Sequence, residues 1–117
     1  MPTTIAPAGQ LVNLVPATQT ATTNGTSIVP AARVKNHSVY IIGTGTISSG
    51  TLVIEESEDP AFSGTWSSIQ SVTLSGVTGG AIQVVHFTSS SMAIRSRVSV
   101  AVGGGGSIQV DYRGETD

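Results

Sequence analysis

The 117-residue sequence contains no cysteine, only one lysine and only one tryptophan. Without cysteine, disulfide bonds, thiolate metal sites and cysteine-based catalysis are all excluded. Charged residues make up 10% of the chain, five basic and seven acidic, which gives a net charge of −2. Binding nucleic acid by neutralising phosphates requires clustered Lys and Arg, whereas these five basic residues are spread from Arg33 to Arg113. The composition therefore predicts no nucleic-acid partner.

Long apolar runs are also missing. No segment approaches the ~20 apolar residues of a membrane helix, and the N-terminus lacks the basic-then-apolar order of a signal peptide, so no membrane partner is expected. The length suits one domain, whose core can form without metal or disulfides. With 38% hydrophobic residues and so little charge, the composition favours a surface partly covered by other protein.

The first 32 residues have no charged side chain and carry four of the five prolines. Proline opposes helix and threonine favours extended chain, so residues 1–15 are predicted to form an extended arm and residues 16–117 a β-sandwich domain. Burial of apolar side chains can offset the cost of ordering a terminus. The alternative is a mobile tail. The predicted partner-binding residues, expected to dock on a neighbouring subunit, are Leu11, Val12, Leu14 and Val15.

Turn residues separate short β-branched runs from Arg33 to the end, at the spacing typical of a sandwich or barrel. The predicted fold is all-β, a single antiparallel β-sandwich, jelly-roll-like, with the extended N-terminal arm. Asn24-Gly25 is the strongest short hairpin signal. The clearest unit is Gly50 to Ile69, read as strand, acidic turn and strand, with a bulge or sheet crossing between Trp66 and Leu74 because the alternation breaks there.

The C-terminal third predicts another hairpin. A loop of Gly103 to Gly105 would pair Val100 with Ile108, Val98 with Val110 and Arg97 with Asp111, keeping core side chains opposite one another. Residues 81–87, AIQVVHF, are apolar on both parities and are expected to be buried on both faces. The predicted core contains one tryptophan with aliphatic side chains from these strands: Trp66, Ile54, Ile94, Val98, Val100, Ile108 and Val110.

Catalytic signals are weak throughout. His37 and His86 cannot form a three-ligand zinc site without carboxylates, and no serine lies in a G-x-S-x-G elbow. The glycines at 103–106 precede a predicted strand, not the helix of a phosphate-binding loop. The predictions are therefore no catalytic residue, no metal ligand, no cofactor and no enzyme activity.

The acidic group is the densest cluster of charge, and it is interpreted as a solvated turn that fits no calcium loop. An alternative is pairing with Arg95 or Arg97 on a neighbouring strand or subunit. Trp66 is predicted to be buried, the alternative being an exposed ring that stacks on a sugar. The acidic residues concerned are Glu55, Glu56, Glu58 and Asp59.

Three segments together resemble a known group of proteins: VIEES at 53–57 followed by Trp66 and Ile69, AIRSRV at 93–98, and SIQVDY at 107–112 after a glycine turn. The pattern, over about residues 37–113, resembles the small β-sandwich virion proteins of tailed bacteriophages, including head-decoration (cement) proteins and tail or fibre modules. The acidic turn from Glu58 to Gly64 is longer than in the common pattern.

The resemblance implies a decoration protein on the capsid surface of a virion, which binds and stabilises the lattice of the major capsid protein or contacts another virion protein. It also implies a homo-oligomer, taken to be a trimer. The alternative is a carbohydrate-binding tail or fibre module that uses Trp66 and nearby polar loops.

Overall fold

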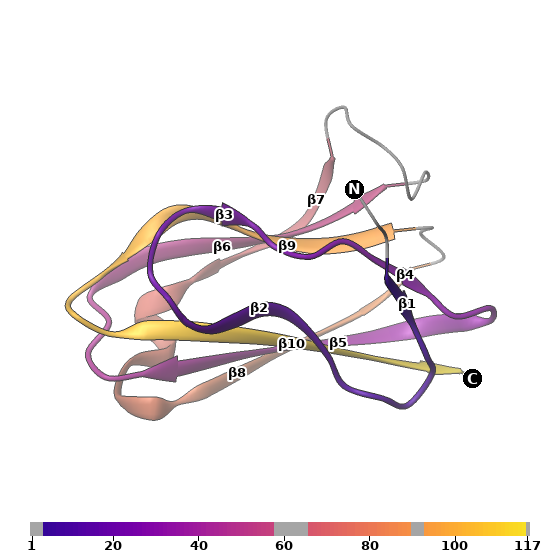
Figure 1. Ribbon diagram of the computed structural model, residues 1–117, viewed down its shortest axis with the longest axis horizontal. Coiled ribbons are helices and arrows are strands. Elements are labelled where there is room, and N and C mark those ends of the chain that lie inside the picture. The colour runs from indigo at the N-terminus through magenta and orange to yellow at the C-terminus, as the bar shows by residue number, and fades with distance from the viewer. Residues whose placement is uncertain (1–3, 58–65, 90–92, 117) are drawn as a thin grey trace.

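The computed structural model describes residues 4–57, 66–89 and 93–116, which form two β-sheets packed as a sandwich (Figure 1). Sheet A has the strand order β1-β4-β9-β6-β7, with β3 also pairing with β9, and sheet B has the order β2-β10-β5-β8. Apart from β1, which runs parallel to β4, the strand pairs are antiparallel. The strands are β1 (Thr4–Ala6), β2 (Val12–Gln19), β3 (Thr23–Asn24), β4 (Ile28–Pro30), β5 (Val34–Thr44), β6 (Ser49–Ser57), β7 (Ser67–Thr73), β8 (Ile82–Thr88), β9 (Ala93–Gly103) and β10 (Ser107–Thr116), with a 3-10 segment η1 (Leu74–Gly80).

This order confirms the predicted all-β sandwich and its jelly-roll-like arrangement. The chain passes from one sheet to the other at every connection between consecutive strands except β3–β4 and β6–β7, so each sheet combines strands that are distant in sequence. Double-sheet jelly rolls are built in this way from two Greek keys. The core between the sheets is aliphatic, with Tyr112 as its largest fully buried side chain.

The predicted strand pair around the acidic turn is confirmed. β6 and β7 pair antiparallel, and Leu52 and Ile54 both lie fully buried on the inner face, as their shared parity indicates. The register shifts by one residue at Ile69, which is the predicted bulge and explains why Ile69 has the opposite parity from Val72. The turn itself, including Glu58 and Asp59, lies outside the described residues.

The described residues of the predicted arm, 4–15, lie within the sandwich. β1 pairs with β4 in sheet A, and β2, which begins inside the predicted arm at Val12, pairs with β10 in sheet B. Figure 1 shows β1 and β2 lying along the two sheets. The premise that residues 4–15 stand apart from the domain therefore needs correction, because their backbone hydrogen bonds are made to its strands.

The Asn24-Gly25 prediction is partly wrong. Short strands do flank the pair, but β3 and β4 both pair with β9, so they follow one another along β9 and make no hairpin. Gly25 instead allows a close backbone approach: its N–H donates to the carbonyl of Ser96 at 2.8 Å. A Cβ at this position would lie 2.8 Å from the carbonyl oxygen of Leu14 and closer still to that of Ser96. Glycine is required here for its missing side chain.

The predicted C-terminal hairpin is wrong, because β9 and β10 belong to different sheets. Val98 pairs with Leu52 of β6, and Val110 pairs with Ile41 of β5, so neither faces the other across a ladder. The glycine loop crosses between the sheets and packs on the β5–β6 connection, where the N–H of Gly106 donates to the carbonyl of Thr46 at 2.7 Å. The predicted alternation of inward and outward side chains is right along β10 and along β9 as far as Val98, but alternation does not specify the partner strand.

Two members of the predicted core lie outside it. Ile54, Ile94, Val98, Ile108 and Val110 belong to the core between the sheets, whereas Trp66 is buried outside that core and Val100 is 52% exposed. Val98 and Val100 are two residues apart on β9, but their partners Leu52 and Thr51 on β6 are adjacent. The extra residue, Ser99, is a β-bulge that turns Val100 to the outer face.

Residues 81–87 were expected to be buried on both faces, and this is wrong for the isolated chain. β8 is an edge strand of sheet B, with Val85 buried and Phe87 packed against the core. On the other face, Ile82 is 60% and Val84 39% exposed. One apolar face of β8 is therefore left uncovered.

Candidate functional site

The outer face of sheet A carries a buried carboxylate held by two arginines. Glu55 on β6 is directly opposite Arg95 on β9, and its Oε1 accepts a hydrogen bond from Arg95 Nε at 2.9 Å. Arg97 Nε lies 3.3 Å from both carboxylate oxygens. Since side chains alternate along a strand, Glu55, Arg95 and Arg97 all point away from the inter-sheet core.

Glu55 is therefore not part of a solvated turn, which corrects the first interpretation and confirms the alternative pairing with Arg95 and Arg97. A carboxylate buried in this way is tolerated because it is both paired and hydrogen-bonded. The two arginines outnumber the single carboxylate, so this group keeps one net positive charge. Among the described residues only the Nε of Arg97 is engaged, which leaves its two terminal nitrogens as donors for a partner.

Trp66 is buried, as predicted, but on this outer face. The guanidinium carbon of Arg95 lies 4.5 Å from the centre of the Trp66 ring, a cation–π contact. The residue as a whole is 8% exposed. One ring face is occupied and little of the other surface is open, so Trp66 is not placed to stack on a sugar.

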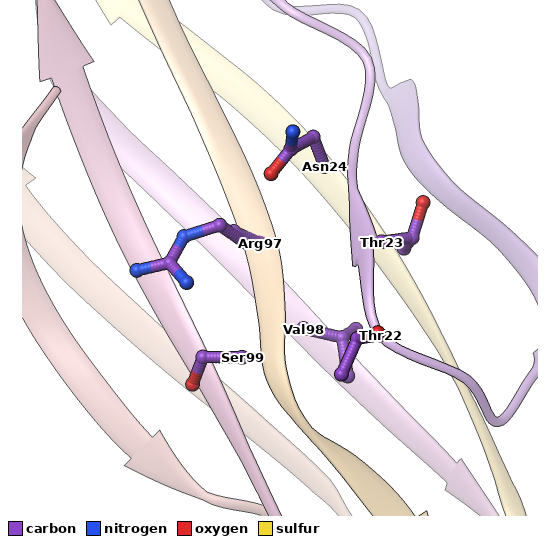
Figure 2. Close-up of a pocket in the computed structure, with 6 residues that line it drawn as sticks. All are labelled: Thr22, Thr23, Asn24, Arg97, Val98 and Ser99. Atoms are coloured by element: carbon purple, nitrogen blue, oxygen red, sulfur yellow. The ribbon is translucent and has the colours of Figure 1, made fainter. Parts of the chain in front are cut away.

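A shallow hollow of about 390 Å³ lies beside this cluster (Figure 2). In Figure 2, Arg97 and Ser99 extend to one side of β9, and Asn24 extends from β3 toward them. Asn24 and Arg97 are direct partners in the β3–β9 pairing. The hollow presents amide, hydroxyl and guanidinium groups, which suit recognition of a polar surface by hydrogen bonds. Its lining residues are Thr22, Thr23, Asn24, Arg97, Val98 and Ser99.

A second polar group is buried between the sheets. His37 Nε2 lies 2.8 Å from the carbonyl of Ser89, which can only accept, so Nε2 carries the proton and Nδ1 accepts from the Tyr112 hydroxyl at 2.6 Å. The Ser89 hydroxyl in turn donates to Glu56 of β6 at 2.8 Å. This chain of bonds links sheet B to sheet A, and every His37 ring nitrogen is used structurally.

Burial governs the acid–base properties of this group. Desolvation lowers the pKa of His37 below its ordinary 6.5, although the bond to Ser89 and the charge of Glu56 act in the opposite direction. Burial also raises the pKa of Tyr112. Both residues are therefore neutral in the folded protein near neutral pH, and the Phe87 ring stacked 4.9 Å from His37 limits access to it.

The other histidine has a simple environment. His86 lies on the exposed face of the edge strand β8, with its Nδ1 2.9 Å from the Ser38 hydroxyl. In the described part of the chain no group of three or more His, Asp or Glu is arranged to hold a metal ion. Nor is any helix within those ranges long and apolar enough to cross a membrane.

The predicted partner-binding residues divide into two groups. Leu14 and Val15 are fully buried in the chain's own core, so their side chains are not available to a partner. Leu11 is 63% exposed and Val12 is half-buried. The prediction of partner binding therefore remains only for Leu11 and Val12.

Sequence reasoning missed two features of the site. The His37–Tyr112 bond joins residues 75 positions apart, and no local pattern marks it. The hollow combines Asn24 of β3 with Arg97 of β9. The sequence did not indicate this pairing, because Asn24-Gly25 was interpreted as the turn of a hairpin. Of these groups, only the Glu55 cluster could be anticipated from the sequence. Arg95 and Arg97 are two residues apart on one strand, so their side chains point to the same face.

No protein-family model, curated protein or solved structure matches this chain.

Proposed function

We propose that this chain is a structural protein of a bacteriophage virion, a capsid decoration protein that binds the outside of the major capsid lattice. The observation that carries the proposal is Arg97, which the buried Glu55 anchors on a sheet face that also carries several hydroxyl side chains. An arginine held in place loses little side-chain entropy on binding, and arginine is enriched among the residues that dominate interfaces.

The surroundings of Arg97 support a protein partner. Thr51 and Thr73 are opposite one another on β6 and β7, and Ser71 is opposite Val53, so the outer face of sheet A is polar and mostly uncharged. Interfaces are depleted of Lys, Asp and Glu at their centres. The fold is consistent with the sequence resemblance, because double-sheet jelly rolls recur in viral capsid and lectin domains. A fold shared by analogy is weaker support than the residues of the face itself.

The lectin-like alternative is a carbohydrate-binding tail or fibre module. With Trp66 covered by Arg95, this alternative now depends on the hollow at Asn24, Arg97 and Ser99. Amide and hydroxyl groups around a guanidinium match the donors and acceptors of a sugar. The hollow is shallow and has no exposed aromatic ring among its lining residues, so it favours a sugar less than a protein surface.

Co-sedimentation of the purified chain with DNA-filled heads that lack it tests the proposal. We expect saturable binding, weakened about tenfold or more by Arg97→Ala, because the anchored donors are lost. Lys35→Ala removes the same charge from an exposed position and should leave the affinity unchanged. Leu11→Ser tests the remaining exposed member of the predicted partner-binding cluster.

Two results would reject the decoration role. One is that the chain does not bind heads at concentrations at which a characterised decoration protein saturates its sites. The other is binding to soluble oligosaccharides that Asn24→Ala and Ser99→Ala abolish while head binding is absent, which would establish the alternative. Deleting residues 1–15 is not a suitable test, because it removes the core side chains Leu14 and Val15.

A further inference from the structure

The free edge of β8 presents unpaired backbone groups in a defined pattern. The carbonyl of Ala81 accepts from Gly43 at 3.1 Å, and the N–H of Ser89 donates to Lys35 at 2.9 Å, so the odd-numbered residues bond to β5. Antiparallel strands alternate which residues face the partner. The N–H and C=O groups of Ile82, Val84 and His86 therefore point to the open side of the sheet.

In the described part of the chain the other edge strands are short or interrupted, and β8 is not. β1 is three residues long, β2 contains Pro16 and two register shifts, and β7 has the bulge at Ile69. Natural proteins use short strands, proline, bulges and charges to prevent edge pairing. β8 pairs with β5 over seven residues without a shift and contains no proline, glycine or charged residue.

Apolar side chains flank the same edge. The register places Ile82 beside Ile42 and Val84 beside Tyr40 on the outer face of sheet B. Ile82 and Val84 are the exposed members, while Ile42 and Tyr40 are half-buried. The sequence of β8, apolar on both faces, is typical of a strand inside a sheet and not of one at its border.

We propose that β8 pairs antiparallel with β8 of a second copy of this chain, which joins two four-stranded sheets into one continuous sheet across a twofold axis. Centring the pair on Val85 aligns all seven residues of both strands. Val84 then faces His86 of the second copy, and Ile82 faces its Thr88. In both of these pairs the N–H and C=O groups of the two residues point to the open side of the sheet, so they can bond to each other as an antiparallel ladder requires.

A second copy satisfies this edge better than an unrelated strand. A twofold axis makes the edge its own complement in length and hydrogen-bond spacing, and it brings no like charges into opposition because β8 has none. It also sets the exposed Val84 and Ile82 side chains beside His86 and Thr88 of the second copy on the outer face, which covers part of their surface. The inference does not depend on the proposed function, and it specifies a dimer where the resemblance implies a trimer.

Analytical ultracentrifugation of the full chain over a concentration series is the first test. We expect a monomer–dimer equilibrium that Val84→Lys weakens by about tenfold or more, since a lysine at an edge opposes pairing. Val100→Lys places the same charge at a similarly exposed position on sheet A and should leave the equilibrium unchanged. A monomer up to about 1 mM, a trimer, or a dimer that Val84→Lys does not weaken would overturn the proposal.

A cross-linking test uses the absence of native cysteine and does not rely on the lysine variant. Facing residues of a hydrogen-bonded pair lie about 5.5 Å apart at Cα, within disulfide range. The double variant V84C/H86C should therefore form a covalent dimer on mild oxidation. L11C/V100C carries two exposed thiols away from β8 and is the control. If both variants cross-link at equal rates, or neither does, the β8 pairing is refuted.

Discussion

Two valines on one strand provide the sharpest test of this structure. Val98 and Val100 are two residues apart on β9 and look equivalent in the sequence, yet Val98 is 1% exposed and Val100 is 52% exposed. Val98→Ala removes two buried carbon groups, worth about 0.8 kcal/mol each, and leaves a small cavity. The free energy of unfolding should fall by roughly 2 kcal/mol. Val100→Ala should change it by less than about 0.5 kcal/mol.

Urea unfolding followed by circular dichroism measures both values, because linear extrapolation with an unchanged m-value isolates a change in stability. In thermal unfolding, the Val98 variant should melt roughly 8 °C lower, at about 4 °C per kcal/mol for a domain near this size. Equal losses for the two variants would refute the bulge at Ser99, and so would a larger loss at Val100. The β6–β9 pairing in the middle of sheet A would then need a different register.

Two further perturbations probe the polar groups. Glu55→Gln should lower the free energy of unfolding by about 2 kcal/mol in urea titrations, less than for a fully buried pair because water reaches Arg97. The control, Glu115→Gln, breaks the exposed pair with Arg113 and should lower it by no more than about 0.5 kcal/mol. Equal losses for the two variants would contradict the burial of Glu55. Because the pKa of folded His37 lies below 6.5, the unfolded chain takes up the proton first, so stability should fall as pH drops below about 6.5. His37→Gln should remove that slope between pH 6.5 and 5 while His86→Gln retains it, and a slope unaffected by His37→Gln would assign the proton uptake elsewhere.

The fold class could be read from the sequence because it depends on local rules. Turn residues at regular spacing, β-branched runs and the absence of a helical period are each set by a few neighbouring residues. The parity of Leu52 with Ile54, and the break at Ile69, also follow from a two-residue period. These predictions are confirmed, as is the pairing of β6 with β7.

Two of the incorrect predictions, the C-terminal hairpin and the Asn24-Gly25 hairpin, concern which strand lies beside which. A short glycine loop favours a hairpin locally, but in the sandwich β10 completes a different sheet between β2 and β5. Asn24-Gly25 has hairpin composition, yet Gly25 serves the close approach of β9 and β2. Such choices depend on the burial of whole sheet faces, which no single loop determines.

The sequence by itself determined that this chain is an all-β protein with a small aliphatic core, little charge and no cysteine chemistry. It also placed Glu55 and the two arginines on strands with compatible faces. Only the tertiary structure decided that Leu14 and Val15 belong to the core, that Val100 lies outside it, and that β8 is left at an edge. The physical reason is that side-chain direction follows from neighbours along the chain, whereas burial depends on contacts between strands many residues apart.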